Sequence, residues 1–162
     1  MPSFFIMESE PHPISIENRS SARLARGPLV AFVGKVRTSL RLRGDIAILI
    51  TSNDELQRLN REFRGKDKPT DVLSFPSEVR GHAGDIAISA QIAAENARLR
   101  KLTVTEETKV LILHGLLHLA GYDHETDRGE MARKEQLLRR RFGLTESLIA
   151  RTNGHVKRKV RR

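Results

Sequence analysis

The sequence predicts an α+β fold, a single compact domain in which a mixed sheet of about four strands packs against about five helices. Three observations lead to this prediction. The chain of 162 residues has the length of one domain. Short runs of β-favouring residues lie among longer segments in which apolar residues recur at helical spacing. Cysteine is absent, so burial of apolar side chains has to hold the core, which a domain of this size can do without disulfides.

Four short segments are predicted to be strands: residues 14–17, 46–50, 72–75 and 85–89. The first alternates apolar and polar side chains with the period of two that is typical of a half-buried strand. The second is a continuous apolar run that is too short for a helix, which indicates a buried strand. The third is stopped by Pro76. This pattern leaves open which strands pair in parallel and which pair antiparallel.

Five longer segments, caps included, are predicted to be helical: residues 28–40, 52–65, 90–99, 103–120 and 128–142. Pro28 suits the first turn of a helix, where a backbone N–H has no intrahelical partner. Ser52 with Glu55, and Thr103 with Glu106, have the spacing of an N-terminal capping box. Three glycines stand where a helix would end: Gly65, Gly121 and Gly143.

The chain is predicted to divide into a flexible leader at residues 1–13, a folded domain at 14–150 and a basic disordered tail at 151–162. No apolar run approaches the ~18–20 residues that span a bilayer. The N-terminus lacks a basic stretch and is followed by Glu8 and Glu10, so we expect no secretory signal peptide. These features predict a cytoplasmic protein with no membrane partner.

The positive charge of the chain is concentrated in two places. The net charge is +9. The segment from Arg19 to Arg43 contains seven basic and no acidic residues, and the segment from Arg151 to Arg162 contains six basic and no acidic residues. Clustered positive charge attracts polyanions, of which nucleic acid is the commonest. Charge alone leaves the alternative of a solubilising tail and a solvated helix face.

Three histidines lie within eleven residues, at positions 114, 118 and 124. His114 and His118 are four residues apart on a predicted helix and therefore share one face. Gly121 stands where a left-handed residue would end the helix and turn the chain, so His124 can approach the same point. The pattern predicts an open three-nitrogen metal site at the C-terminal end of this helix. The alternative, ordinary core or surface histidines, would be favoured for an isolated pair.

The same spacing, H-x3-H-x2-G-x2-H, is that of the metzincin proteases. Those enzymes carry Glu directly after the first histidine as the general base, whereas this chain has Gly115. Glycine cannot take a proton, so a metallopeptidase is the second hypothesis.

Phosphodiester chemistry suits the predicted site better. Three neutral imidazoles leave the charge of a divalent ion uncompensated, which favours an anionic substrate in a basic protein. Arg64, Lys66 and Lys68, in one predicted loop, could stabilise charge on a reacting phosphate, although a solvated loop is an equal alternative. Asp123 and Glu125 flank His124 and could orient an imidazole or act on water; a turn-forming role is favoured for Asp123.

Residues 114–124, H-G-L-L-H-L-A-G-Y-D-H, resemble the signature H-G-x-L-H-L-x-G-Y-D-H of the YbeY family, metal-dependent endoribonucleases also called rRNA maturation factors. Residues 59–76 resemble the long central block of that family, and residues 84–88 resemble its short strand motif. The resemblance covers roughly residues 14–142. Phe63 stands where many members have Tyr.

The resemblance implies that residues 14–150 form an endoribonuclease domain with one zinc-like ion held by His114, His118 and His124. Imidazole also accepts nickel, copper or iron, so zinc is an expectation with Ni²⁺ or another divalent ion as alternatives. The implied activity is single-strand-specific cleavage of RNA in maturation of the 16S rRNA 3′ end and in ribosome quality control. The attacking group stays open between metal-bound water and a substrate 2′-hydroxyl.

The resemblance places the family's functionally sensitive arginine at Arg64, which together with His114 is predicted to be catalytic. The basic residues predicted to contact RNA are Lys66, Lys68, Arg37 and Arg41. The expected partners are single-stranded or ribosomal RNA and the ribosome or its small-subunit proteins, with the chain itself a monomer. A third hypothesis is a non-catalytic ribosome assembly factor whose metal is structural; such a site would be closed by a fourth protein ligand.

Overall fold

A four-stranded sheet with the order β1-β2-β4-β3 is the centre of the computed structural model, which describes residues 12–144. The bounds of its strands are β1 Ile14–Asn18, β2 Asp45–Thr51, β3 Val72–Pro76 and β4 His82–Ser89. β1 with β2 and β2 with β4 are parallel, whereas β3 and β4 are antiparallel. The sheet is therefore mixed, as predicted. Most of the predicted leader, residues 145–150 and the basic tail lie outside the described residues.

Five helices complete the described fold: α1 Arg26–Leu40, α2 Asn53–Arg64, α3 Ala90–Arg100, α4 Val104–Leu119 and α5 Glu130–Arg141. α1 begins two residues before Pro28, which the first turn tolerates because its N–H groups lack intrahelical acceptors. The last helix begins at Glu130, two residues later than predicted. The Asp127 carboxylate accepts hydrogen bonds from the N–H groups of Gly129 and Met131, which ties the preceding residues into a turn.

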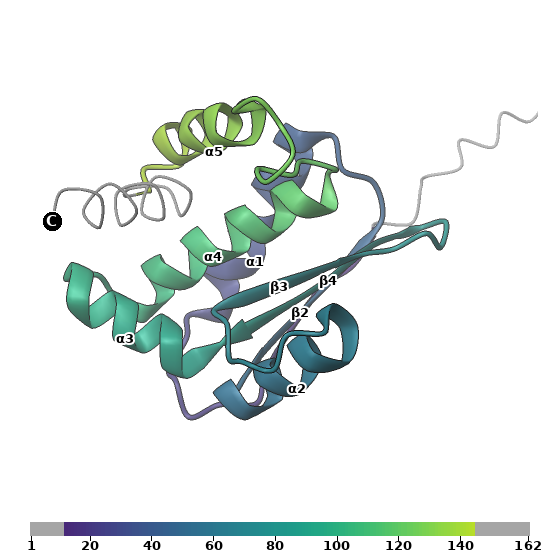
Figure 1. Cartoon of the computed structure of the whole chain (residues 1–162). Coiled ribbons are helices and arrows are strands. Elements are labelled where there is room, and N and C mark those ends of the chain that lie inside the picture. Colours follow the sequence, from purple (N-terminus) through teal and green to yellow (C-terminus); the bar gives the residue numbers. More distant parts are fainter. Residues whose placement is uncertain (1–11, 145–162) are drawn as a thin grey trace, which may run out of the picture.

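The helices cover the two faces of the sheet unequally (Figure 1). α1 and α4 pack on one face, where the main core contains Ile46, Ile48 and Ile50 from alternate positions of β2, and α5 packs on the outer side of α4. α2 lies on the opposite face over a small cluster that includes Leu56 and Leu73. The described part of the chain is thus a layered α+β structure with its larger core on the α4 side.

α4 is the helix that positions the site. Thr103 and Glu106 form the predicted capping box at its start. From Leu111 onward, side chains on most sides of the helix are buried with relative exposures of 0 to 1%: Leu111, Ile112, Leu113, Leu116 and Leu117. A helix that is apolar all round lies inside the core. Any polar side chain on this stretch is therefore held in place by dense packing.

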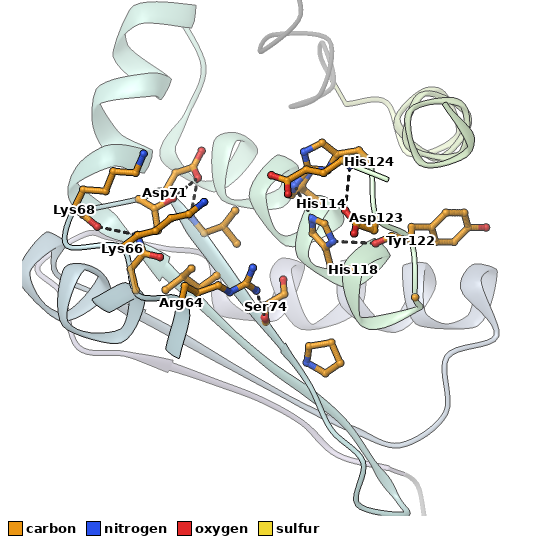
Figure 2. Close-up of a pocket in the computed structure, with 17 residues that line it drawn as sticks. Arg64, Lys66, Lys68, Asp71, Ser74, His114, His118, Tyr122, Asp123 and His124 are labelled. Carbon is orange, nitrogen blue, oxygen red and sulfur yellow. Dashed lines mark hydrogen bonds between the residues drawn. The ribbon is translucent and has the colours of Figure 1, made fainter. Parts of the chain in front are cut away.

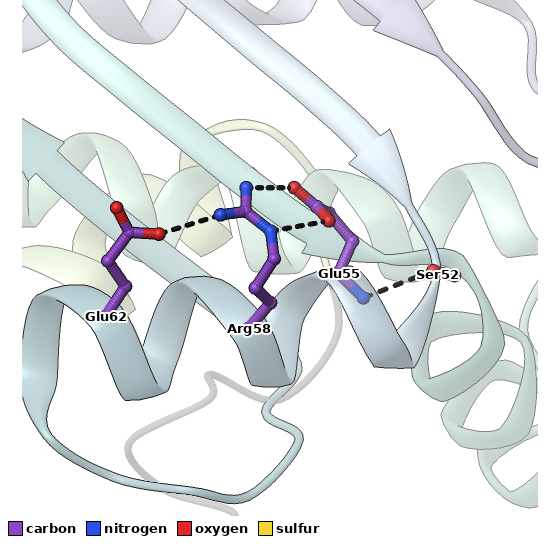
Figure 3. A network of polar contacts seen from close by, with 4 residues as sticks. All are labelled: Ser52, Glu55, Arg58 and Glu62. Carbon is purple, nitrogen blue, oxygen red and sulfur yellow. Dashed lines mark hydrogen bonds and ion pairs between the residues drawn. The ribbon is translucent and has the colours of Figure 1, made fainter.

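α2 carries a ladder of charged side chains on its solvent face (Figure 3). Ser52 accepts a hydrogen bond from the Glu55 N–H, which is one half of the predicted capping box. The Glu55 carboxylate instead accepts two hydrogen bonds from Arg58, which also donates to Glu62 at 2.7 Å. The hydrogen bonds from Arg58 lower the pKa of Glu55. The opposite face of α2 packs on the sheet, so the position of its last residue, Arg64, is well defined.

No helix among residues 12–144 is long and apolar enough to cross a membrane.

Candidate metal centre

The imidazoles of His114, His118 and His124 converge on one point. Their ring centroids lie 4.8 to 5.4 Å apart, and one ligand nitrogen from each lies within 4.8 Å of the other two. The Nε2 atoms of His114 and His118 are 3.2 Å apart. Within the described residues no fourth histidine or carboxylate joins this group. Three converging nitrogens without a fourth protein ligand fit an open metal site better than a closed structural one.

The turn after α4 brings the third histidine back to the helix. Gly121 has a φ of +95°, and its N–H donates to the His118 carbonyl. Asp123 then accepts hydrogen bonds from the Glu125 N–H and the Thr126 hydroxyl. Asp123 therefore builds the turn, as predicted.

Hydrogen bonds at the Nδ1 atoms orient two of the three imidazoles. His118 Nδ1 lies 2.9 Å from the Tyr122 carbonyl oxygen, which can only accept, so Nδ1 carries the proton. The Nε2 lone pair of His118 is then available to a metal ion. His114 Nδ1 lies 3.2 Å from the carboxylate of Glu135, a residue of α5. Both contacts leave Nε2 facing the shared point, so the donor set fits a divalent transition metal.

Burial lowers the pKa of His118, and the nearby imidazoles of His114 and His124 lower it further. Burial favours the neutral form because a charged imidazole would lose its hydration. Neutral imidazole is the form that binds metal. His118 is thus ready to act as a ligand at neutral pH.

The stability of the metal-free protein should consequently fall as pH falls below about 6.5, the ordinary pKa of histidine. The lowered pKa means that the unfolded chain binds a proton at His118 more tightly than the folded chain does. Stability therefore rises with pH through the window between the lowered pKa and 6.5, and the contribution is complete above it. Urea unfolding of chelator-treated protein between about pH 5 and 8 measures this dependence. His118→Gln should flatten it; the same slope in both proteins would contradict the assignment.

The histidines form one side of a cavity of about 570 Å³ (Figure 2). Arg64, Lys66 and Lys68, which we call the basic wall, line its other side. The sequence left a solvated loop as an equal alternative for these three residues. The structure places all three on the same cavity as the predicted metal ligands, and all three are also exposed to solvent.

Arg64 is the last residue of α2 and not part of a loop, whereas Lys66 and Lys68 follow in the loop after it; specific contacts hold both segments. Gly65 ends α2 in a left-handed conformation, and the Asn60 amide donates to the Lys68 carbonyl at 2.9 Å. Arg64 Nη2 donates to the Ser74 carbonyl at 2.8 Å, and the Ser74 hydroxyl donates to the Gly115 carbonyl at 3.2 Å. These bonds link α2, β3 and α4. The guanidinium of Arg64 is therefore positioned relative to the helix that carries two of the histidines.

Arg37 and Arg41, the other two predicted RNA contacts, are not among the residues that line this cavity. Arg37 is in α1, where Nη1 donates to the His12 carbonyl at 2.8 Å. Arg41 is the left-handed residue that ends α1. The structure therefore separates the four predicted RNA contacts into two surfaces.

Gly115 is packed against the sheet. A Cβ at this position would lie 2.9 Å from the Ile86 Cδ1 and 3.1 Å from the Ser74 Oγ. The glutamate that metzincins carry here would thus have no room, and its carboxylate would be directed into the core. This packing counts against the metallopeptidase hypothesis.

Gly115→Glu should destabilise the protein by about 3 kcal/mol or more, because it overpacks the core and buries a charge. Thermal unfolding measures the effect, and Gly115→Ala should lower the melting temperature by less. Gly34 is a matched control, since a Cβ there would meet only the Ile14 Cδ1 at 3.7 Å. Gly34→Ala should be neutral or stabilising. Wild-type stability in Gly115→Glu would show that the site has room for a base.

Sequence reasoning missed two residues of the site. Glu135 is buried in α5 and contacts His114, and Ser74 is buried in β3 and contacts both Arg64 and Gly115. The available signal for Glu135 was its place four residues after Met131 and three before Leu138, in an otherwise apolar stripe. Ser74 carried no comparable signal.

Comparison with known proteins finds a matching family model, relatives of similar sequence and a solved structure of similar fold. A family model described as "Endoribonuclease YbeY" matches residues 7–143. A Koribacter versatilis protein named "Endoribonuclease YbeY" is 48% identical over 147 residues, 91% of this chain and 97% of that protein. One of the same name from a Sulfurovum species is 47% identical over 74% of this chain and 86% of its own length. A solution structure from Thermotoga maritima is similar with a TM-score of 0.56 and 32% identity, covering 76% of this chain and 85% of that one.

Proposed function

The chain belongs to the YbeY endoribonuclease family, and on that premise we propose that it is a metal-dependent, single-strand-specific endoribonuclease. The observation that supports this most is the arrangement in one cavity: three imidazoles on one side and the basic wall on the other. The first side fits a divalent cation and the second fits a phosphodiester.

His114, His118 and His124 would hold the ion, with zinc as the expected metal. When bound, a divalent ion of this kind polarises a phosphoryl oxygen and promotes deprotonation of an attacking hydroxyl. Arg64 would donate hydrogen bonds to the phosphate as negative charge grows on its oxygens. The Ser74 carbonyl fixes one end of the guanidinium, so little side-chain freedom is lost when substrate binds. Lys66 and Lys68 would attract the neighbouring phosphates.

A single strand suits this cavity better than a duplex. The ligand nitrogens and the Arg64 guanidinium face a recess rather than a flat surface. A flexible single strand can bend a phosphate into such a recess, whereas the phosphates of an A-form duplex are held in a rigid helix. Gly115 supplies no general base for water, and the nucleophile is either the 2′-hydroxyl of the substrate or water.

The proposal extends to the biological substrate. Family membership supports maturation of the 16S rRNA 3′ end and ribosome quality control in the cytoplasm, with the ribosome or its small-subunit proteins as partners. The net charge of +9 agrees with a polyanionic partner.

Lys66→Glu/Lys68→Glu should weaken binding of single-stranded RNA and flatten its salt dependence. Two lost phosphate contacts should reduce the slope of log K against log salt by about 1.4. The control is Arg37→Glu/Arg41→Glu, which makes the same change of charge away from the cavity and should change the slope less. Fluorescence anisotropy in 50 to 200 mM salt makes the comparison. A larger effect in the control would place the RNA path on α1.

Cleavage of RNA tests the proposed function. Purified wild-type protein loaded with zinc should cut a labelled single-stranded RNA and leave a matched duplex intact. Products that end in 2′,3′-cyclic phosphate would identify the 2′-hydroxyl as the nucleophile, and products with 5′-phosphate and 3′-hydroxyl ends would identify water. Ribosome binding without cleavage of any RNA would favour the assembly-factor hypothesis.

A further inference from the structure

Glu135 is a carboxylate where the helix pattern calls for an apolar side chain. Met131 and Leu138, on the same face of α5, are both fully buried in the main core, and Glu135 between them has a relative exposure of 1%. A buried carboxylate loses its hydration, which is costly unless charged or hydrogen-bonding groups compensate for it. The position of Glu135 therefore calls for a specific partner.

His114 is such a partner. The Oε2 of Glu135 lies 3.2 Å from His114 Nδ1, and the His114 side chain is itself buried. His114 Nε2 points the other way, toward His118 Nε2 at 3.2 Å. The carboxylate thus contacts the ring on the side opposite the shared metal point.

We propose that Glu135 is a positioning residue for the metal ion, a role that rests on the metal-dependent function proposed above. Its carboxylate accepts the Nδ1–H of His114, which fixes the ring orientation and keeps the proton off Nε2. The lone pair of Nε2 is then directed at the ion. The carboxylate also places a negative charge next to a ligand set of three neutral imidazoles, which raises the affinity for a cation.

The imidazoles of His118 and His114 form hydrogen bonds with different kinds of acceptor. His118 is oriented by the uncharged carbonyl of Tyr122, a group of its own turn. His114 is oriented by a charged group from α5, 21 residues further along the chain. Glu135 thus couples the packing of α5 to the metal centre, which a backbone acceptor near His114 would not do.

Glu135→Gln and Glu135→Leu test the proposal. Gln keeps the shape and an acceptor oxygen but removes the charge, and Leu removes both. We expect zinc to bind about 10-fold more weakly to the Gln variant and up to about 100-fold more weakly to the Leu variant, measured by competition with a chromophoric chelator. The visible absorption of bound Co²⁺ should change in both. Glu95→Gln is the control, because it removes one charge from an exposed ion pair on α3 and should keep wild-type affinity. Wild-type zinc affinity in both Glu135 variants would overturn the proposal.

A measurement on the wild-type protein keeps the proposal testable if neither variant folds. Long-range ¹H–¹⁵N correlation spectra of the imidazoles report which nitrogen carries the proton. We expect His114 to be protonated at Nδ1 both before and after addition of zinc. A proton on Nε2 in the zinc-free protein would overturn the role assigned to Glu135. The proposed function fails separately, if wild-type protein binds no metal or cuts no RNA.

Discussion

Arg64→Glu should abolish cleavage of single-stranded RNA while the protein still binds metal and remains folded. The Arg64 side chain ends on the cavity that the three histidines line, and its guanidinium is held by the Ser74 carbonyl. Removing one positioned donor to a developing negative charge costs about 100-fold or more in rate. Glutamate adds repulsion of the substrate phosphate. The single-turnover rate, with metal content and melting temperature measured on the same sample, gives the result.

Arg61→Glu is the matched control for this substitution. Arg61 lies three residues earlier on α2, where it forms an exposed ion pair with Asp67 at 3.4 Å, and it does not line the cavity. Arg61→Glu and Arg64→Glu change the net charge of the protein by the same amount. Equal loss of cleavage in both would mean that general electrostatic attraction, not placement of Arg64, is responsible.

His114→Ala should remove most of the bound metal and, with it, the cleavage of RNA. The substitution deletes one of three nitrogen donors and leaves the Glu135 carboxylate buried beside an empty space. With two donors left, we expect metal affinity to fall by about 100-fold or more, since loss of a supporting residue alone costs about 10–100-fold. Elemental analysis after dialysis measures the metal, and His118→Ala and His124→Ala should behave alike.

His82→Ala is the control for this series. His82 belongs to β4 and pairs with Asp85 at 3.3 Å, outside the cavity. It should retain the wild-type metal content. Metal retained in all three variants of the triad, or lost equally from His82→Ala, would remove the histidines from the site.

The site could be predicted from the sequence where its residues are close along the chain. His114 and His118 share a helix face because of their spacing, and Gly121 turns the chain so that His124 follows them. The contacts of Glu135 and Ser74 could not be predicted in this way. They depend on how α5 and β3 pack on α4, and nothing in the local pattern specifies that packing.

In the sheet, too, local features could be predicted from the sequence whereas contacts between distant segments could not. Alternation and apolar runs located the strands, but β4 lies between β2 and β3, and this order depends on contacts between distant segments. β4 begins at His82, three residues earlier than predicted, because Gly84 has weak strand propensity on its own and is held by pairing with Ile46 and Pro76, while a register shift leaves Ala83 between two paired residues. β3 ends at Pro76, as predicted, and includes this proline as its last residue; an edge strand tolerates the missing N–H.

Restoring metal to metal-stripped wild-type protein tests most directly the claim that the three histidines hold a catalytic ion. The chelator-treated protein should fail to cut single-stranded RNA, and cleavage should return in proportion to added zinc until one ion is bound per chain. His114→Ala treated in the same way should regain no activity at that stoichiometry. Undiminished cleavage by the metal-free wild-type protein would contradict the account.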